Sequence, residues 1–271
     1  MAEHGLHPSR ALGQHFVTDP NTTERIARLA RVGGGDRVIE IGAGLGSLTV
    51  ALAATGAEVT ALEVDHGLVP VLREMVEPLG VTVVEADAMS CDWESLLAAA
   101  ACWVLVANLP YNVATPLVIE LLRRVPAIGR MLVMVQREAG DRLVASPGTA
   151  SFGAVSVRVA YFATAVLVGR VPPGVFLPRP KVESVLVELQ RRASPAVDPA
   201  QASYEEIDLL LRAGFAGRRK MLRRSLDKLV DESVFAAAGV DGRSRAEELS
   251  IEKWGKLVAC RRSIISGRPP S

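Results

Sequence analysis

The hydrophobic residues of the chain fall into short apolar runs separated by stretches with helical spacing. Apolar runs at 37–41, 58–62, 81–84, 103–107 and 131–135 predict buried strands. Helices are predicted at 47–55, 66–79, 115–124 and 136–143, and β-rich segments at 155–168 and 182–189 supply two further strands. Strands that alternate with helices in this way predict an α/β fold with a doubly wound, mostly parallel sheet of seven strands.

The first strand runs into a glycine loop. Gly42-Ala43-Gly44-Leu45-Gly46 lies between a strand and a helix, the context in which such a loop binds a nucleotide-like ligand. Glycines let a ligand approach the backbone, and the helix N-terminus offers free N–H groups. Ser47 stands where a dinucleotide-binding loop has its last glycine. The spacing therefore favours a cofactor without a pyrophosphate.

Acidic residues follow the second and third strands. Glu63 lies 21 residues after Gly42, where a carboxylate can accept hydrogen bonds from both hydroxyls of a ribose. Asp87, followed by Ala88, offers an acceptor for an adenine amino group. The alternative for both acids is a solvated carboxylate at a strand end.

The fourth strand stops at Asn108-Leu109-Pro110-Tyr111. Pro110 fixes its own φ and favours an extended Leu109, so the chain leaves the sheet in a defined direction. Ligands bind at the carboxyl ends of strands in open α/β sheets. An amide beside an aromatic ring at this edge suits a planar base with an amino group. The alternative is an ordinary strand-to-loop turn with a packed tyrosine.

Charge divides the chain into two parts. Residues 1–190 carry 15 Lys or Arg and 19 Asp or Glu, whereas residues 191–271 carry 16 and 11. Because 191–201 has the composition of a linker, we expect domains at 1–190 and 191–271, the second small and all-helical. A basic run in the second domain favours contacts with phosphates over a merely solvated face. It comprises Arg218, Arg219, Lys220, Arg223 and Arg224.

The cysteines and the N-terminus indicate a compartment. Cys91, Cys102 and Cys260 show no paired spacing, which argues against disulfides or a metal site and favours a reducing cytoplasm. The N-terminus is polar, and no apolar run approaches the roughly 20 residues that span a bilayer. We expect a cytoplasmic monomer without metal and without membrane contact.

Two further segments complete a recognisable pattern. Leu12-Gly13-Gln14-His15-Phe16 precedes a helix capped by Asp19, and alone it indicates a loop with a surface histidine. Phe176-Leu177-Pro178-Arg179-Pro180-Lys181-Val182-Glu183-Ser184 alone indicates a connector stiffened by prolines. With the glycine loop, Glu63-Val64-Asp65, Asp87-Ala88-Met89, Asn108-Leu109-Pro110-Tyr111-Asn112 and Phe215-Ala216-Gly217-Arg218-Arg219-Lys220, the chain resembles the KsgA family of ribosomal RNA adenine-N6 dimethyltransferases. The glycine loop is shared with most S-adenosylmethionine enzymes, but the combination is specific.

The resemblance implies a Rossmann-like class I S-adenosylmethionine methyltransferase with a helical C-terminal domain. It places Gly42 and Gly44 at the methionine part of the cofactor and Glu63 at the ribose. Asp87 and Ala88 lie at the adenine, and Asn108 lies beside the sulfonium. His15 and Val17 help to cover the cofactor. The family usually has Asn at His15 and Leu at Val17.

The resemblance also implies an acceptor site. Asn108 and the carbonyl of Leu109 accept hydrogen bonds from the adenine amino group, and Pro110 shapes the turn. Tyr111 and Phe176 sandwich the base, each stack contributing roughly 1–3 kcal/mol.

The expected substrate is two adjacent adenines in the 3′-terminal hairpin loop of 16S rRNA, methylated twice each within an assembling 30S subunit. One alternative is a 23S rRNA adenine-N6 methyltransferase of the macrolide-resistance type. Another is a non-catalytic ribosome-assembly or RNA-binding factor. Glu63, Asn108, Pro110 and Tyr111 occur together, which favours catalysis.

Overall fold

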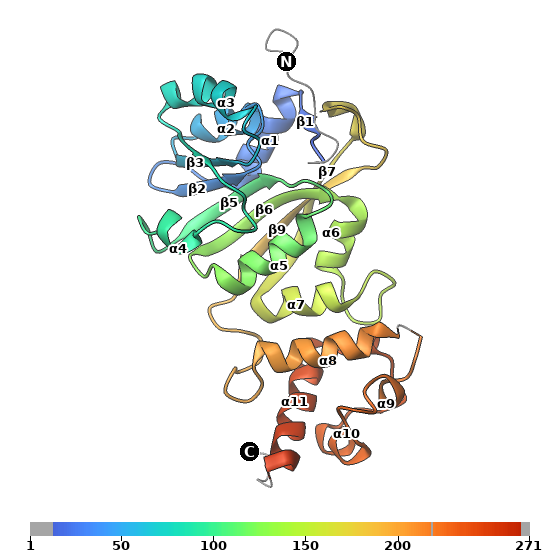
Figure 1. Ribbon diagram of the computed structural model, residues 1–271. Helices are drawn as coiled ribbons and strands as arrows, with labels where there is room; N and C mark the ends of the chain where they lie inside the picture. Colours follow the sequence, from blue (N-terminus) through green and yellow to red (C-terminus); the bar gives the residue numbers. More distant parts are fainter. Residues whose placement is uncertain (1–12, 218, 267–271) are drawn as a thin grey trace. The chain divides into compact units, whose positions relative to one another are not determined.

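The computed structural model describes residues 13–217 and 219–266 (Figure 1). The chain forms two compact units, the first made of Met1–Gly140 and Ala165–Arg191, the second of Asp141–Thr164 and Arg192–Ser271. The predicted first domain, 1–190, included 141–164, which the structure assigns to the second unit instead. The reason is packing: Val157 and Tyr161 belong to the hydrophobic core that contains Trp254.

The first unit is built on a seven-stranded sheet with the order β4-β3-β2-β5-β6-β9-β7. The strands are β2 (Arg37–Ile41), β3 (Glu58–Glu63), β4 (Thr82–Glu85), β5 (Trp103–Asn108), β6 (Ile128–Gln136), β7 (Ala163–Val171) and β9 (Ser184–Arg191). Neighbours from β4 to β6 are parallel, and β9 runs antiparallel to β6. Ile41 lies opposite both Leu62 and Ala107, so three strands end at one edge. The predicted mostly parallel sheet of seven strands is confirmed.

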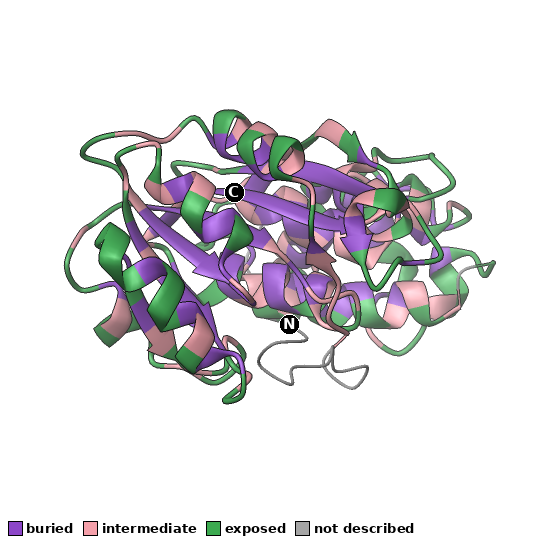
Figure 2. Cartoon of the chain, turned by 90° about the horizontal axis from the view of Figure 1, so that it is seen from above, coloured by how far each residue is buried: buried purple, intermediate pink, exposed green. Residues whose placement is uncertain are grey.

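Helices cover this sheet. They are α1 (Pro20–Ala30), α2 (Ser47–Ala53), α3 (Val69–Val76), η2 (Glu77–Leu79), α4 (Trp93–Leu96), α5 (Ala114–Arg124) and the start of α6 (Arg137–Val144). Alternate strand residues such as Val104 and Val106 pack with Ile26 of α1, Leu52 of α2 and Leu72 of α3 in one core cluster. Figure 2 shows the strands largely buried and the outer helix faces exposed. A separate two-stranded sheet joins β1 (Phe16–Val17) to β8 (Phe176–Leu177), which follows η3 (Pro173–Val175).

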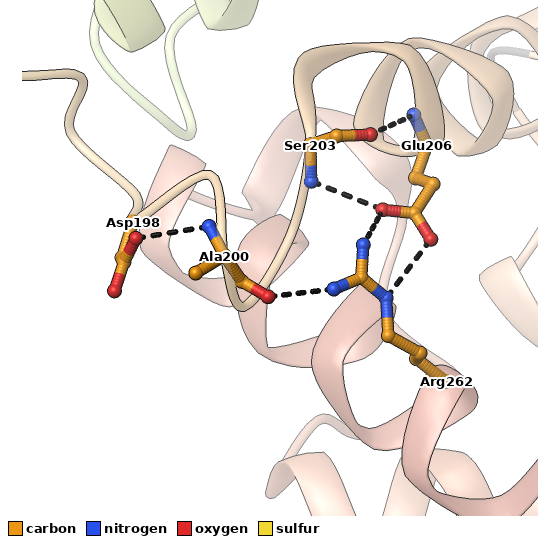
Figure 3. Close-up of polar contacts among 5 residues, drawn as sticks. All are labelled: Asp198, Ala200, Ser203, Glu206 and Arg262. Atoms are coloured by element: carbon orange, nitrogen blue, oxygen red, sulfur yellow. Dashed lines mark hydrogen bonds and ion pairs between the residues drawn. The ribbon is translucent and has the colours of Figure 1, made fainter. Parts of the chain in front are cut away.

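The second unit is helical, with α7 (Ala154–Phe162), α8 (Tyr204–Ala216), α9 (Leu222–Ser225), α10 (Glu232–Ala238), η4 (Ala246–Glu248) and α11 (Ile251–Ser266). A polar cluster anchors the start of α8 (Figure 3). Ser203 Oγ accepts the N–H of Glu206 at 3.3 Å, and the Glu206 carboxylate accepts the N–H of Ser203 at 3.0 Å. Arg262 of α11 pairs with Glu206 and donates to the carbonyl of Ala200 at 2.6 Å. The capping box and the last helix therefore support each other.

The strand predicted at 155–168 is wrong in its first half, because 154–162 forms α7 and the strand starts at Ala163. Val155, Val157 and Val159 favour a strand locally, but Val157 and Tyr161 are four residues apart and share a buried helical face. None of the helices in the described ranges has the length and apolarity that a bilayer crossing needs.

Candidate active site

A cavity of about 240 Å³ lies at the carboxyl ends of β2, β3, β4 and β5. The residues predicted as site residues that line it are His15, Gly42, Gly44, Glu63, Asp87, Ala88, Asn108, Leu109, Pro110 and Tyr111. Because parallel strands end at one edge, segments far apart in sequence meet here.

The glycine loop forms one wall of the cavity. Gly42, Gly44 and Gly46 have φ values of +73°, +58° and +83°, in the left-handed region that favours glycine. A Cβ on Gly44 would lie 2.9 Å from Cε1 of Phe16, so this position requires glycine for space as well. The loop leaves bare backbone facing the cavity.

Glu63 is held rigidly beneath this loop. Its side chain is 4% exposed, and Oε2 accepts the N–H of Gly44 at 2.7 Å. Oε1 accepts the N–H groups of Val64 and Asp65 at 2.9 and 3.0 Å. A carboxylate has about four acceptor sites, so these bonds leave capacity for roughly one strong bond to a ligand hydroxyl.

A second carboxyl group, Glu40, lies in the middle of the sheet and was missed in the sequence. It is 1% exposed, and burial, with a smaller effect of the nearby Glu63 charge, raises its pKa to about 8. Glu40 is therefore mostly protonated at neutral pH. An acidic residue inside an apolar strand is the signal that identifies such a group.

Asp87 lies in the turn after β4. Its Oδ1 accepts the N–H of Met89 at 2.8 Å, and the carboxylate remains exposed at the cavity. One oxygen is thereby fixed and the other stays available to a ligand. Ala88 follows Asp87, and its small side chain leaves space in this part of the cavity.

Asn108 ends β5 with its amide oriented by a backbone group. Asn108 Nδ2 donates to the carbonyl of His15 at 2.9 Å. Because the amide nitrogen is engaged, Oδ1 is the atom left to accept a hydrogen bond. The N–H of Leu109 donates to the carbonyl of Met134 at 3.1 Å, which fixes the turn that Pro110 completes.

Tyr111 is half-buried and held by two contacts. Its hydroxyl lies 2.9 Å from Oγ of Ser184, and its ring stacks on His15 with centroids 5.1 Å apart and planes 27° apart. Burial raises the pKa of Tyr111, with the Ser184 hydrogen bond opposing that effect, so the phenol keeps its proton at neutral pH.

The segment 13–17 crosses the strand ends as a strap. Gln14 Nε2 donates to Asp65 Oδ2 at 2.8 Å, and Nδ1 of His15 donates to the carbonyl of Pro178 at 2.7 Å. The strap thus joins the end of β3 to the loop after β8.

Comparison with known proteins identifies the family. The model of a family described as ribosomal RNA adenine dimethylase matches residues 7–261. The chain belongs to this family. It is an S-adenosylmethionine-dependent rRNA adenine dimethyltransferase.

Individual relatives agree. A protein named ribosomal RNA small subunit methyltransferase A from Cutibacterium acnes is 43% identical over 267 residues, which covers 94% of the chain and 89% of that relative. A protein of the same name from Magnetococcus marinus is 40% identical over 264 residues, covering 95% and 93%.

Solved structures show the same fold. The 23S rRNA methyltransferase ErmE matches with a TM-score of 0.71 and 26% identity, covering 91% of the chain and 99% of that protein. A dimethyladenosine transferase from Plasmodium falciparum matches with a TM-score of 0.77 and 23% identity, covering 94% and 100%. The first unit therefore has the fold of a class I methyltransferase.

Two of the residues that the family pattern suggests do not reach the cavity. Val17 and Phe176 are 6% and 4% exposed and pair across β1 and β8, where both join the hydrophobic core. Neither residue lines the cavity in this structure, and the sandwich of a base between Tyr111 and Phe176 stays a prediction. The ring that stacks on Tyr111 here is His15, whereas the pairing of β1 with β8 places Phe176 in the hydrophobic core.

The basic run belongs to the second unit. Arg219, Lys220, Arg223 and Arg224 are exposed, and the N–H of Arg223 donates to the carbonyl of Gly242 at 2.8 Å. Arg218 lies outside the described residues.

Proposed function

We propose that this dimethyltransferase acts on N6 of two adjacent adenines in the 3′-terminal hairpin loop of 16S rRNA, within the assembling 30S subunit in the cytoplasm. The observation that carries the acceptor assignment is the oriented Asn108 amide, whose free Oδ1 lies beside Tyr111 on the cavity that Glu63 also lines. The relatives named small subunit methyltransferase A, at about 40% identity over most of both chains, favour the 16S substrate.

The cavity suits S-adenosylmethionine, which would supply an electrophilic methyl group on a sulfonium. Gly42 and Gly44 present backbone without side chains, so the methionine part can approach closely. Glu63 offers a charged acceptor to the ribose, and its three backbone bonds leave room for one direct hydroxyl contact. Asp87 and Ala88 border the adenine. His15, which belongs to the segment 13–17, would lie over the cofactor.

Asn108 would prepare the acceptor nitrogen. The lone pair of an adenine amino group is delocalised into the ring, which makes the nitrogen a weak nucleophile. Hydrogen bonds from its two protons to Asn108 Oδ1 and to the carbonyl of Leu109 favour a pyramidal nitrogen with its lone pair directed at the methyl group. Positioning of the reacting groups in this way can supply most of the rate enhancement of a group transfer.

Tyr111 would stack on the base once it is turned out of the RNA. A base-on-tyrosine stack contributes roughly 1–3 kcal/mol. Because His15 already covers one face of the ring, the base takes the other face or displaces the imidazole. The exposed cations of the second unit would contact phosphates of the 30S particle, with the enzyme acting as a monomer.

A labelled methyl donor tests the substrate directly. We expect label on adenine when the protein is incubated with 30S subunits that lack these methyl groups, and none with naked 23S rRNA. The likeness to ErmE makes 23S rRNA the second candidate, and label in 23S alone would establish it instead.

A substitution separates catalysis from binding. Glu63→Gln removes the charge that faces the ribose, so we expect the dissociation constant of S-adenosylmethionine to rise at least tenfold, since hydrogen bonds to charged groups contribute about 1.5–3 kcal/mol. Glu74→Gln on the exposed face of α3 is the control and should bind as the wild type does. Unchanged cofactor binding in Glu63→Gln would refute the ribose assignment, whereas 30S binding without turnover in the wild type would indicate an assembly factor.

A further inference from the structure

A second cavity in the first unit, of about 230 Å³, has two arginines among its five lining residues. Its lining comprises Arg137, Leu167, Gly169, Arg170 and Val185. Arg137 directly follows β6, and Val185 lies at the start of β9, which is antiparallel to β6. The cavity therefore lies at the same edge of the sheet as the active site.

Hydrogen bonds connect this cavity to the acceptor site. Ser184, the residue before Val185, bonds to the hydroxyl of Tyr111 at 2.9 Å. Arg137 donates its N–H to the carbonyl of Glu183 at 3.0 Å, and its guanidinium binds the Glu183 carboxylate at 2.9 Å. The arginine cavity is thus one residue from the group that holds Tyr111, and Arg137 is held in place beside it.

More arginines than acidic side chains lie at or beside this cavity. Arg25 of α1 does not itself line the cavity, but it donates to the carbonyl of Arg170 at 2.9 Å, and its guanidinium lies against Gly169, where a Cβ would be 2.6 Å from Nη2. Neither Arg25 nor Arg170 forms an ion pair with an acidic residue in the described ranges, and only Arg137 is balanced, by Glu183.

A cluster of arginines is unexpected in this part of the chain, because residues 1–190 contain more acidic than basic side chains. Arg25 is also half-buried, which a merely solvated surface charge would not be. An uncompensated guanidinium at a cavity, here that of Arg170, attracts anions, and the planar guanidinium matches a phosphate with two parallel hydrogen bonds.

We propose that the arginine cavity binds a phosphodiester of the RNA strand that carries the acceptor adenine, with Arg170 as the main contact and with Arg25 holding the backbone of Arg170. This inference rests on the proposed function. When a base is turned out of its stack, its sugar and phosphates stay outside the base pocket. A cationic cavity near Tyr111 would bind that backbone and so position the base against Asn108.

Arg170→Gln tests the proposal, with Arg73→Gln on the exposed face of α3 as the charge-matched control. Binding of a single-stranded RNA that contains the target adenines is measured against salt concentration. We expect Arg170→Gln to weaken binding about tenfold and to lower the salt slope by roughly 0.7, the value for one phosphate of a single strand. The dissociation constant of S-adenosylmethionine and the behaviour of Arg73→Gln should match the wild type.

A second variant guards against a purely structural effect. Leu167 is 44% exposed at the cavity, so Leu167→Glu adds an opposing charge without disturbing the core, and it should weaken RNA binding as well. Normal RNA affinity and salt slope in both variants, with wild-type methylation of adenine intact, would overturn the arginine site alone. A wild-type protein that methylates no adenine in any RNA would instead overturn the proposed function.

Discussion

The hydroxyl of Tyr111 lies 2.9 Å from Oγ of Ser184, a side chain that is fully buried at the start of β9. Ser184 is the last residue of the segment Phe176–Ser184 that the family pattern singles out, yet its side chain does not line the active-site cavity. The bond ties the turn after β5 to β9, so the Tyr111 ring is held from outside the cavity. Ser184 is therefore a positioning residue for the acceptor site.

Ser184→Ala should lower activity through Tyr111. A neutral hydrogen bond contributes about 0.5–1.5 kcal/mol, so we expect kcat/KM for RNA to fall between twofold and tenfold. The dissociation constant of S-adenosylmethionine should not change, because Ser184 does not reach the cavity. Tyr111→Phe should cause a similar loss, and the double variant should lose no more than either single one. Fully additive losses would show that the two hydroxyls act independently.

Gly44→Ala should abolish cofactor binding. The substitution strains a backbone with φ of +58° and drives Cβ to 2.9 Å from the Phe16 ring, which lines the cavity. Gly80→Ala is the matched control, since Gly80 has φ of +82° but nothing within 4 Å of the added Cβ. Both variants should lose about 1–2 kcal/mol of stability from the left-handed backbone.

Calorimetric titration with S-adenosylmethionine distinguishes the two glycine variants. Gly80→Ala should bind as the wild type does, whereas Gly44→Ala should show no heat of binding. Equal binding by both variants would mean that the Phe16 ring moves away from the added Cβ without any loss of cofactor affinity.

Much of this site was predictable because local patterns determine where strands end. The apolar runs before Gly42, Glu63, Asp87 and Asn108 each mark a strand, and parallel strands bring their ends together. The place of Phe176 was less predictable, because the pairing of β1 with β8 decides that its ring lies in the hydrophobic core. That pairing joins residues about 160 positions apart, for which no local periodicity exists. Helix α7 was missed for a similar reason, since a distant core selects its conformation over the strand preference of its valines.

Glu40 should make stability depend on pH in an unusual direction. Its pKa is about 8 in the folded protein, against 4.5 for an unperturbed glutamate. Between these values the unfolded chain releases a proton that the folded protein retains, so rising pH favours unfolding over this window. Glu40→Gln lacks this group, and its melting temperature relative to wild type should rise by several degrees between pH 5 and pH 8.

Thermal unfolding of both proteins at pH 5, 6, 7 and 8 measures this effect, because all other titrating groups are shared. A difference in Tm that stays constant across the series would show that Glu40 is ionised in the folded state at neutral pH.

The basic run of the second unit should contribute to RNA affinity without setting base specificity. Arg219, Lys220, Arg223 and Arg224 are exposed, and replacing each with Gln should weaken 30S binding and reduce its salt dependence, by roughly 0.9 in slope for each duplex phosphate that the protein no longer neutralises. Arg243→Gln is the control from the same unit, since Arg243 is already paired with Asp241 at 3.1 Å. Cofactor affinity should stay at the wild-type value in every variant, because none of these side chains lines the cavity. An unchanged slope in the fourfold variant would mean that the run only faces solvent, and the phosphates would then have to be bound by the first unit.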